Sequence, residues 1–167
     1  MVVLGIDCGS EITGYGVVDG SGGKLRYIDA GAIRVSTRNG LPQKLKAIFA
    51  ALQEVIAKNR PECVAIEDVF YAVNAKSALK LGHVRGVAML AASSAGLPVA
   101  EYAPLAIKSS VVGYGKAEKS QVQSMVKRLL ALKSEPDPPD VADALAIAIC
   151  HIHTAATLRK QGASTSA

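Results

Sequence analysis

Four acidic residues stand where the chain is otherwise strongly apolar. Asp7 and Glu67 each close a short run of apolar residues, and Asp140 and Asp143 precede an almost purely apolar stretch. Crowding buried, unpaired carboxylates costs several kcal/mol, whereas the dipole of a helix start offsets only ~0.3–1 kcal/mol for each acid near it. A cation is therefore the natural partner of these side chains.

The four residues supply oxygen ligands only, with no histidine and cysteine set among them. Oxygen ligands suit hard ions, so Mg²⁺ is the expected cofactor, with Mn²⁺ able to substitute and Zn²⁺ disfavoured. A pair of such ions ~3.5–4 Å apart can activate water and stabilise the leaving oxygen in phosphodiester hydrolysis. The acids therefore predict a nuclease active site with two metal ions.

Each acid taken alone also has an ordinary structural interpretation. Asp140 can cap a helix, Asp7 can anchor a turn through an Asx hydrogen bond, and Glu67 can be a solvent-facing strand end. A single position is therefore a weak indicator, and the hypothesis depends on the four residues meeting in space.

The first elements that must position them form an antiparallel meander. Strands are predicted at about 2–7, 13–19 and 25–35, because apolar runs there are separated by short segments rich in glycine and serine. On the first strand Asp7 shares a face with Val3, since side chains two residues apart point the same way.

The middle of the chain alternates helix and strand. Helices are predicted at about 41–58 and 74–95 from apolar periodicity, and strands at 63–67 and 97–101. This order implies parallel pairing through right-handed crossovers. We therefore expect an α/β protein with a mixed five-stranded sheet, in which the first and fourth strands are neighbours.

The last third is predicted to be helical. A short helix at 104–111 and an amphipathic helix ending near 130 lead to a proline-rich loop at 132–139. The helix that follows carries Asp140 and Asp143 on one face, because residues three apart are neighbours on a helix. Residues 158–167 lack apolar periodicity and are expected to be a disordered tail.

Composition limits the class of protein. A chain of 167 residues suits one domain, expected at 1–157. No signal peptide and no uninterrupted apolar run of membrane-spanning length is present, so no membrane is expected. Three cysteines without C-x-x-C spacing indicate reduced thiols and a cytoplasmic protein. A net charge of +5 permits nucleic acid as a partner without demonstrating it.

With these residues in place, the chain resembles the RuvC family of crossover junction endodeoxyribonucleases, the Holliday junction resolvases of bacteria. The likeness extends over nearly the whole chain and is far more specific in combination than in any one motif. It rests on LGID at 4–7, TGYGV at 13–17, AIE at 65–67, SALKLG at 77–82, RG at 85–86, VVG at 111–113, AEKSQV at 117–122 and DVADALA at 140–146.

The resemblance implies an RNase H-like fold and a homodimer with two active sites. It makes Asp7, Glu67, Asp140 and Asp143 the catalytic, metal-binding acids. It also implies paired symmetric nicks at a four-way DNA junction during homologous recombination and DNA repair, with a preference for thymine-containing sequence. The implied partners are the junction-binding and branch-migration proteins RuvA and RuvB, in the bacterial cytoplasm.

Two positions depart from the family pattern. The family usually has proline where this chain has Cys8, and often glutamine where it has Asp68. Cys8 loosens a turn, and its thiol stands beside the expected metal site. Asp68 is expected to point to the sheet face opposite Glu67 and so not to be a ligand.

Contacts to DNA are expected from one aromatic residue and several cations. By resemblance Phe70 stacks at the junction centre, although a core phenylalanine is the ordinary alternative. Lys108 and Lys119 match family lysines near the site and can neutralise phosphates. Candidates for further backbone contacts are Lys76, Lys80, Arg85 and Lys116.

Parts of the sequence also suit other functions. The opening GIDCGS also suits actin-like ATPases and sugar kinases, which need two comparable domains and a longer chain. A nuclease for structured RNA, like the YqgF relatives, shares the fold, and a junction-binding protein with a dead site would not keep four acids. The helix at 74–95 is apolar on more than one face, which favours a two-fold dimer along it.

Overall fold

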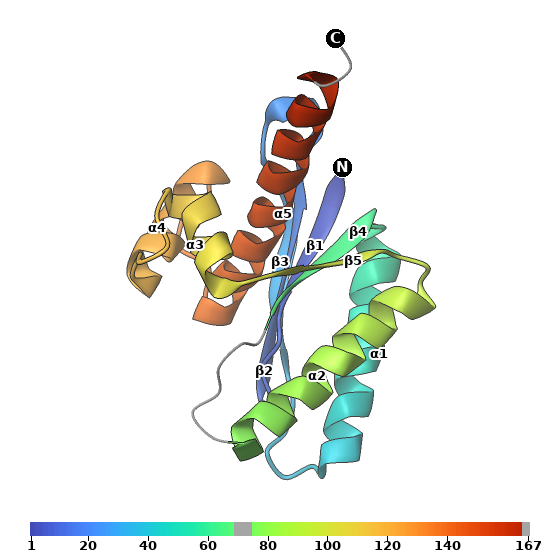
Figure 1. The fold of residues 1–167 in the computed structure, drawn as a ribbon. Coiled ribbons are helices and arrows are strands. Elements are labelled where there is room, and N and C mark those ends of the chain that lie inside the picture. Colours follow the sequence, from blue (N-terminus) through green and yellow to red (C-terminus); the bar gives the residue numbers. More distant parts are fainter. Residues whose placement is uncertain (69–74, 165–167) are drawn as a thin grey trace.

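The computed structural model describes residues 1–68 and 75–164. Its strands and helices follow the predicted order closely (Figure 1). They are β1 (Val2–Asp7), β2 (Ile12–Asp19), the 3₁₀ turn η1 (Ser21–Gly23), β3 (Arg26–Arg34), α1 (Leu41–Asn59), β4 (Cys63–Glu67), α2 (Ala75–Ser94), β5 (Val99–Tyr102), α3 (Pro104–Val112), α4 (Lys119–Leu129) and α5 (Pro139–Ser164).

The strands form one mixed sheet in the order β3-β2-β1-β4-β5. β1 pairs with β2, and β2 with β3, in antiparallel fashion. β4 lies parallel to β1 on one side and to β5 on the other. The mixed five-stranded sheet predicted from the sequence is confirmed, including the neighbouring positions of the first and fourth strands.

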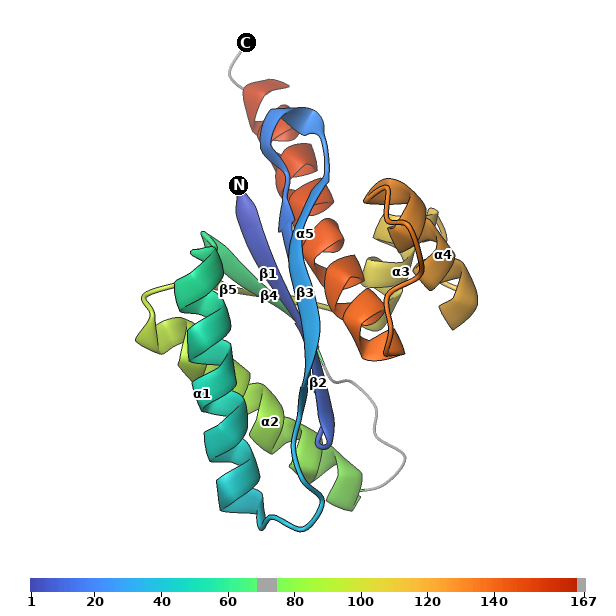
Figure 2. The same ribbon diagram turned by 180° about the vertical axis from the view of Figure 1, so that it is seen from behind.

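Helices cover both faces of this sheet. Figures 1 and 2 show α1 and α2 on one face and α5 on the other, with α3 and α4 packed against α5. Alternate strand residues divide between the two cores. Val3 and Ala65 are buried with α5, whereas Leu4 and Ile66 are buried with α1 and α2. This alternation decides which face each residue at a strand end points to.

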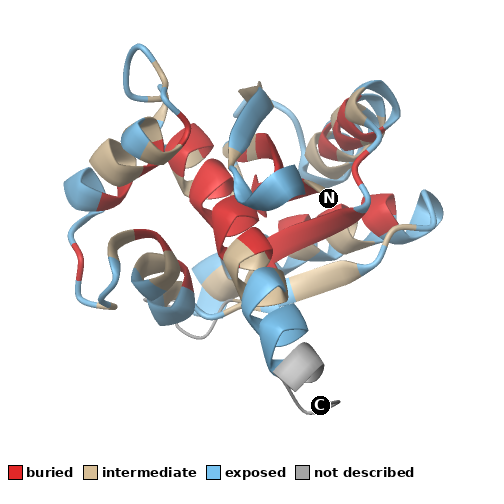
Figure 3. Ribbon diagram, turned by 90° about the horizontal axis from the view of Figure 1, so that it is seen from above, coloured by how far each residue is buried: buried red, intermediate tan, exposed pale blue. Residues whose placement is uncertain are grey.

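Helix α5 is the core helix of the fold. By length and composition alone its residues Pro139–Gln161 pass for a membrane span, the one such helix among the residues described. Every side chain from Ala144 to Cys150 is nevertheless at most 2% exposed within the protein (Figure 3). The apolar surface of α5 is thus buried against the sheet, α3 and α4.

The main chain of α5 lies unusually close to β1 and β2 because glycines face it. A Cβ atom built on Gly5 would stand 2.1 Å from the carbonyl oxygen of Ala144, and one on Gly14 would stand 2.1 Å from that of Asp140. Real Cβ atoms do not approach backbone atoms so closely. Glycine is therefore required at both positions for the helix to dock at this depth.

Two boundaries differ from the sequence prediction. α5 continues to Ser164, so the expected tail is helical from 158 to 164, and a domain boundary at 157 would fall inside the helix. An established helix gains one hydrogen bond per added residue and needs no apolar stripe to extend by two turns. β5 begins at Val99 rather than Leu97, because the Leu97 amide donates to the carbonyl of Ala92 and closes α2. Residues 165–167 lie outside those described.

Gly14→Ala should destabilise the protein strongly. The added methyl group would meet the main chain of α5, and overpacking of this kind costs about 1–3 kcal/mol or more. Urea unfolding monitored by circular dichroism measures the loss. The matched control is Gly31→Ala, whose methyl group would meet only the ring of Tyr15, a side chain able to shift. Equal losses for the two variants would contradict the close docking of α5 as the cause.

Candidate active site

The ends of β1 and β4 bring two of the four acids side by side. The parallel register pairs Ile6 with Ile66, so Asp7 and Glu67 follow as neighbours at the same edge of the sheet. Both have the strand parity of residues buried with α5 and therefore face that helix. The adjacency inferred from topology is thus present.

The start of α5 brings the other two acids to the same edge. Gly14 is the antiparallel partner of Asp7, and the main chain of Asp140 lies directly against Gly14. The first turn of α5 is consequently docked beside the end of β1. Asp143, one turn further, borders the same cleft as Glu67.

Mutual repulsion and burial dominate the electrostatics of this group. Burial raises the pKa of Asp7 from 3.8 to about 7, with Asp143, Glu67 and Asp140 adding to the rise in that order. Burial likewise raises the pKa of Glu67, with Asp143 as the next cause, while Lys108 and Lys119 oppose it. Asp7 and Glu67 are therefore both harder to ionise than free carboxyls, and the positive charge of Lys119 opposes this only in part.

A cleft opens beside the acids, between the sheet edge and α3 to α5. Lys119 approaches Asp143 across it, with 2.6 Å between Nζ and Oδ2. The ammonium of Lys119 is the cation closest to that carboxylate. The lining includes Glu67, Asp143, Lys108, Lys119, Ile107 and Val122.

The residues fit a divalent cation by type and charge. Their donors are carboxylate oxygens. Burial first, and the neighbouring acids after it, raise the pKa of Asp7, and a hard cation would offset both effects. Among the described residues, however, no three His, Cys, Asp or Glu side chains already converge at ligand distance. The carboxylates would have to turn inward, and Asp143 would have to leave Lys119, for an ion to be held.

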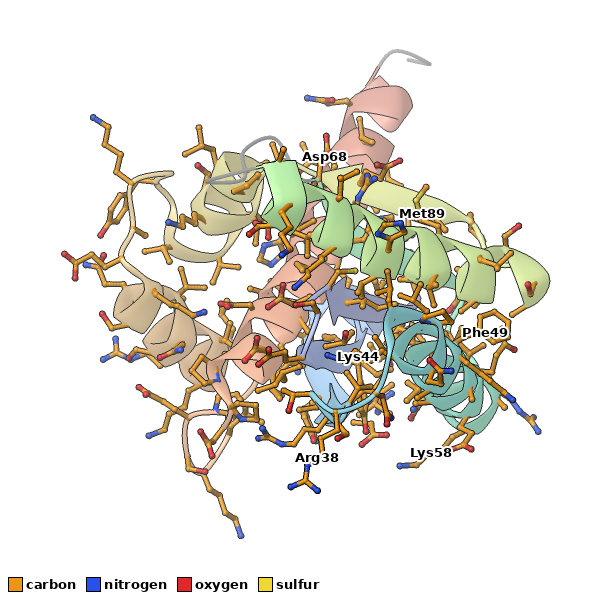
Figure 4. All side chains as sticks on the ribbon, turned by 90° about the horizontal axis from the view of Figure 1, so that it is seen from below. Arg38, Lys44, Phe49, Lys58, Asp68 and Met89 are labelled. Atoms are coloured by element: carbon orange, nitrogen blue, oxygen red, sulfur yellow. The ribbon has the colours of Figure 1, made fainter. Side chains whose placement is uncertain are left out.

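The neighbours of the two strand ends face away from the site, as predicted for Asp68. Asp68 turns toward α2, where Figure 4 labels it, and pairs with Arg85 at 3.3 Å. Cys8 packs against the core on the α1 and α2 side. The guanidinium of Arg85 also contacts the Glu101 carboxylate. Two nitrogens of this guanidinium are thus engaged within the protein, Nε with the Glu67 carbonyl and Nη2 with two carboxylates, and the DNA contact expected of Arg85 stays a prediction.

The other predicted DNA contacts are scattered. Lys76 and Lys116 are exposed, on α2 and on the loop before α4. Lys80 is exposed too and borders a second hollow at the lower end of the molecule, formed with Ser10, Asn39 and Lys44. Phe70 lies outside the described residues.

The sequence did not predict Lys44 as a candidate DNA contact. Figure 4 looks onto the lower end of the molecule and labels Lys44 there, at the start of α1. Its position opposite Lys80 depends on how α1 and α2 pack together and on the Ser10 turn. No local pattern carries that information.

Two histidines in the middle of α5 have structural partners. His151 Nδ1 lies 2.8 Å from the Tyr102 hydroxyl, and His153 Nδ1 lies 3.1 Å from the carbonyl oxygen of Ser110. These contacts tie α5 to β5 and α3.

Comparisons with known proteins agree on one family. The chain matches the family model of RuvC, crossover junction endodeoxyribonuclease, over residues 3–151. It is 65% identical over 164 residues to the protein so named in Koribacter versatilis, covering 98% of this chain and 99% of the relative. The protein of that name in Acidobacterium capsulatum is 57% identical over 168 residues, covering 96% and 98%.

Solved structures give the same result. A Thermus thermophilus RuvC in complex with Holliday junction substrate superposes with a TM-score of 0.88 at 38% identity, covering 93% of this chain and 94% of the other. The yeast mitochondrial Holliday junction resolvase Ydc2 superposes at 0.69 with 16% identity, covering 95% of this chain and 82% of its own, and so shares the fold. The arrangement is the expected RNase H-like one.

Asp7→Asn should stabilise the metal-free protein, and more at pH 8 than at pH 5. A carboxyl whose folded pKa lies above its unfolded value weakens the fold increasingly as pH rises from about 4 to about 7. Melting in EDTA at both pH values measures this, at ~2–4 °C per kcal/mol for a chain of this size.

Asp29→Asn provides a control of opposite sign. Hydrogen bonds from Lys58 and Asn59 outweigh burial and hold the pKa of Asp29 below its ordinary value. The stability that Asp29 contributes is already complete at pH 5, so its loss should be similar at pH 5 and pH 8. A gain for Asp7→Asn that did not grow with pH would contradict the repulsion described for the site.

Proposed function

The chain belongs to the RuvC family of crossover junction endodeoxyribonucleases, and from this premise we propose that it resolves four-way DNA junctions with Asp7, Glu67, Asp140 and Asp143 as its metal-binding acids. The placement of these acids at one edge of the sheet carries the proposal. They come from three separate elements, β1, β4 and α5. Asp143, Glu67 and Asp140 each add to the rise that burial causes in the pKa of Asp7, and Glu67 and Asp143 line one open cleft. Structural needs alone do not explain why a fold would collect four acids there.

The cofactor we propose is Mg²⁺, two ions per site, with Mn²⁺ as a substitute. Oxygen-only donors support a hard ion. When bound, such ions supply an activated water and stabilise the leaving oxygen of a phosphodiester. The oxygens of the four acids would hold them, and the repulsion that raises the pKa of Asp7 would be relieved.

The two lysines of the cleft would serve the phosphate. Lys119 pairs with Asp143, so a cation bound by that carboxylate would release the ammonium toward an incoming phosphate. Lys108, on α3, lines the same cleft. Both positive charges thus lie where the negative charge of the scissile group would be placed.

Two symmetric cuts require two sites, which supports a homodimer. The outer face of α2 is suited to a second copy, since Leu79 is 66% and Leu90 57% exposed. Gly82 and Gly86 lie on this face too, and a Cβ atom at either would meet open space. Small residues flanked by exposed leucines allow the α2 helices of two copies to pack closely about a two-fold axis.

The cellular setting follows from the family. We propose RuvA and RuvB as partners at the junction, in homologous recombination and DNA repair. A bacterial cytoplasm suits the free thiols of Cys8, Cys63 and Cys150. One domain spans the described fold, with two cores sharing a single sheet.

Asp143→Asn should abolish cutting of a synthetic four-way junction while binding persists. Removing one ligand charge disables the metal site but spares the phosphate contacts made elsewhere. Gel assays with Mg²⁺ and with EDTA, on junction, plain duplex and structured RNA, measure cutting and substrate choice. Asp137→Asn, in the exposed loop before α5, is the matched control and should cut normally. Undiminished cutting by Asp143→Asn would overturn the site assignment, and preferred cutting of RNA would overturn the substrate.

Lys44→Gln and Lys80→Gln should each weaken junction binding. The hollow they border is lined by Ser10, three residues after Asp7 at the end of β1, so an arm of the junction can cross both the hollow and the catalytic site. Loss of one phosphate contact lowers the slope of log affinity against log salt by about 0.9. Fluorescence anisotropy across salt concentrations measures it. Lys24→Gln, on the β2–β3 turn at the opposite end, is the control, and an equal loss there would contradict a specific path.

A further inference from the structure

Arg85 joins three elements around the end of the catalytic strand. It extends from α2 and is four-fifths buried, with a side chain 20% exposed. Its Nε donates to the main-chain carbonyl of Glu67 at 3.4 Å, and its Nη2 lies 3.3 Å from Asp68 Oδ1. The same Nη2 donates to Glu101 of β5. One guanidinium therefore links α2 to both neighbouring strands.

The contact with the Glu67 carbonyl concerns the backbone that carries a proposed metal ligand. Glu67 is the last residue of β4 and pairs with Tyr102, and the next amide, of Asp68, donates to the Tyr102 carbonyl at 2.8 Å. β5 thus holds one side of this strand end and Arg85 the carbonyl beside it. Fixing this peptide fixes the direction in which the Glu67 side chain leaves the strand.

Charge favours this inward role over contact with DNA. Asp68 and Glu101 together carry two negative charges against the single positive charge of Arg85. A guanidinium has five donors in a rigid fork, which suits simultaneous contact with two carboxylates and a carbonyl. The group carries net negative charge and would repel a phosphate.

We propose that Arg85 is a positioning residue, which clamps the end of β4 between α2 and β5 and so orients the Glu67 carboxylate for metal binding. This inference rests on the proposed function and deepens it. Because α2 also presents the proposed dimer face, the clamp places each active site relative to the partner helix. Arg85 touches neither the metal nor the DNA.

Arg85→Gln and Glu101→Gln test the clamp from both ends. Loss of groups that orient metal ligands typically costs about 10–100-fold in metal affinity or activity. We expect both variants to bind Mn²⁺ more weakly in electron paramagnetic resonance titrations without DNA. Their single-turnover cutting should fall by a similar factor at limiting Mg²⁺ and partly recover at high Mg²⁺. Junction affinity in EDTA should not change. Arg85→Lys, with one charge but no fork, should recover only part of the loss.

Arg128→Gln, an exposed cation of α4, is the control for loss of charge. If Arg85 instead contacted DNA directly, Arg85→Gln would lower both the affinity for the junction and the salt dependence of that affinity, and Glu101→Gln would cut normally. A purely structural role would lower the melting temperature and leave Mn²⁺ affinity intact. Either outcome overturns the proposal. If the wild-type protein cuts no junction, the proposed function fails, and the Mn²⁺ titrations still decide the role of Arg85.

Discussion

The contact between the backbone of α5 and the glycines of β1 and β2 is the constraint on which the rest of the structure depends. Gly5 and Gly14 let the helix axis come closer to the sheet than any side chain would allow. The β1–β2 register puts Gly14 opposite Asp7, so the same contact sets the distance from β1 to the first turn of α5. The core and the site are thus fixed by a single docking event.

The same docking also brings the four carboxylates close together, which is electrostatically unfavourable. A helix start pressed against the sheet helps to bury Asp7 and brings Asp140 and Asp143 close to it. Burial raises the pKa of Asp7 to about 7, and the neighbouring acids add to the rise. The apolar length of α5 behind them, buried from Ala144 to Cys150, holds the helix in place against this repulsion. The buried apolar core stabilises the fold, whereas the repulsion between the acids is reduced only by cations at the cleft.

Much of this was predictable because it depends on local rules. Strand parity and the parallel neighbours predicted that Asp7 and Glu67 would meet, and helical spacing predicted a shared face for Asp140 and Asp143. The inward pairing of Arg85 was not predictable, because its partner Glu101 lies on another strand. No local sequence pattern distinguishes an arginine paired in this way from one exposed on the surface. Lys44 and Lys80 likewise come together only through the packing of α1 and α2. The helical end of α5 was missed because the extension of a helix needs no pattern of its own.

The order of the elements along the chain has a consequence for synthesis. β1 and β2 are made first, yet the acids that complete the site sit on α5, the last element of the sheet's second layer. Domains fold as they emerge from the ribosome, and pairings between distant segments form late. A nascent chain therefore carries only two of the four candidate site acids, on a sheet that α5 does not yet cover, and the group of four is complete only after the start of α5 has been translated.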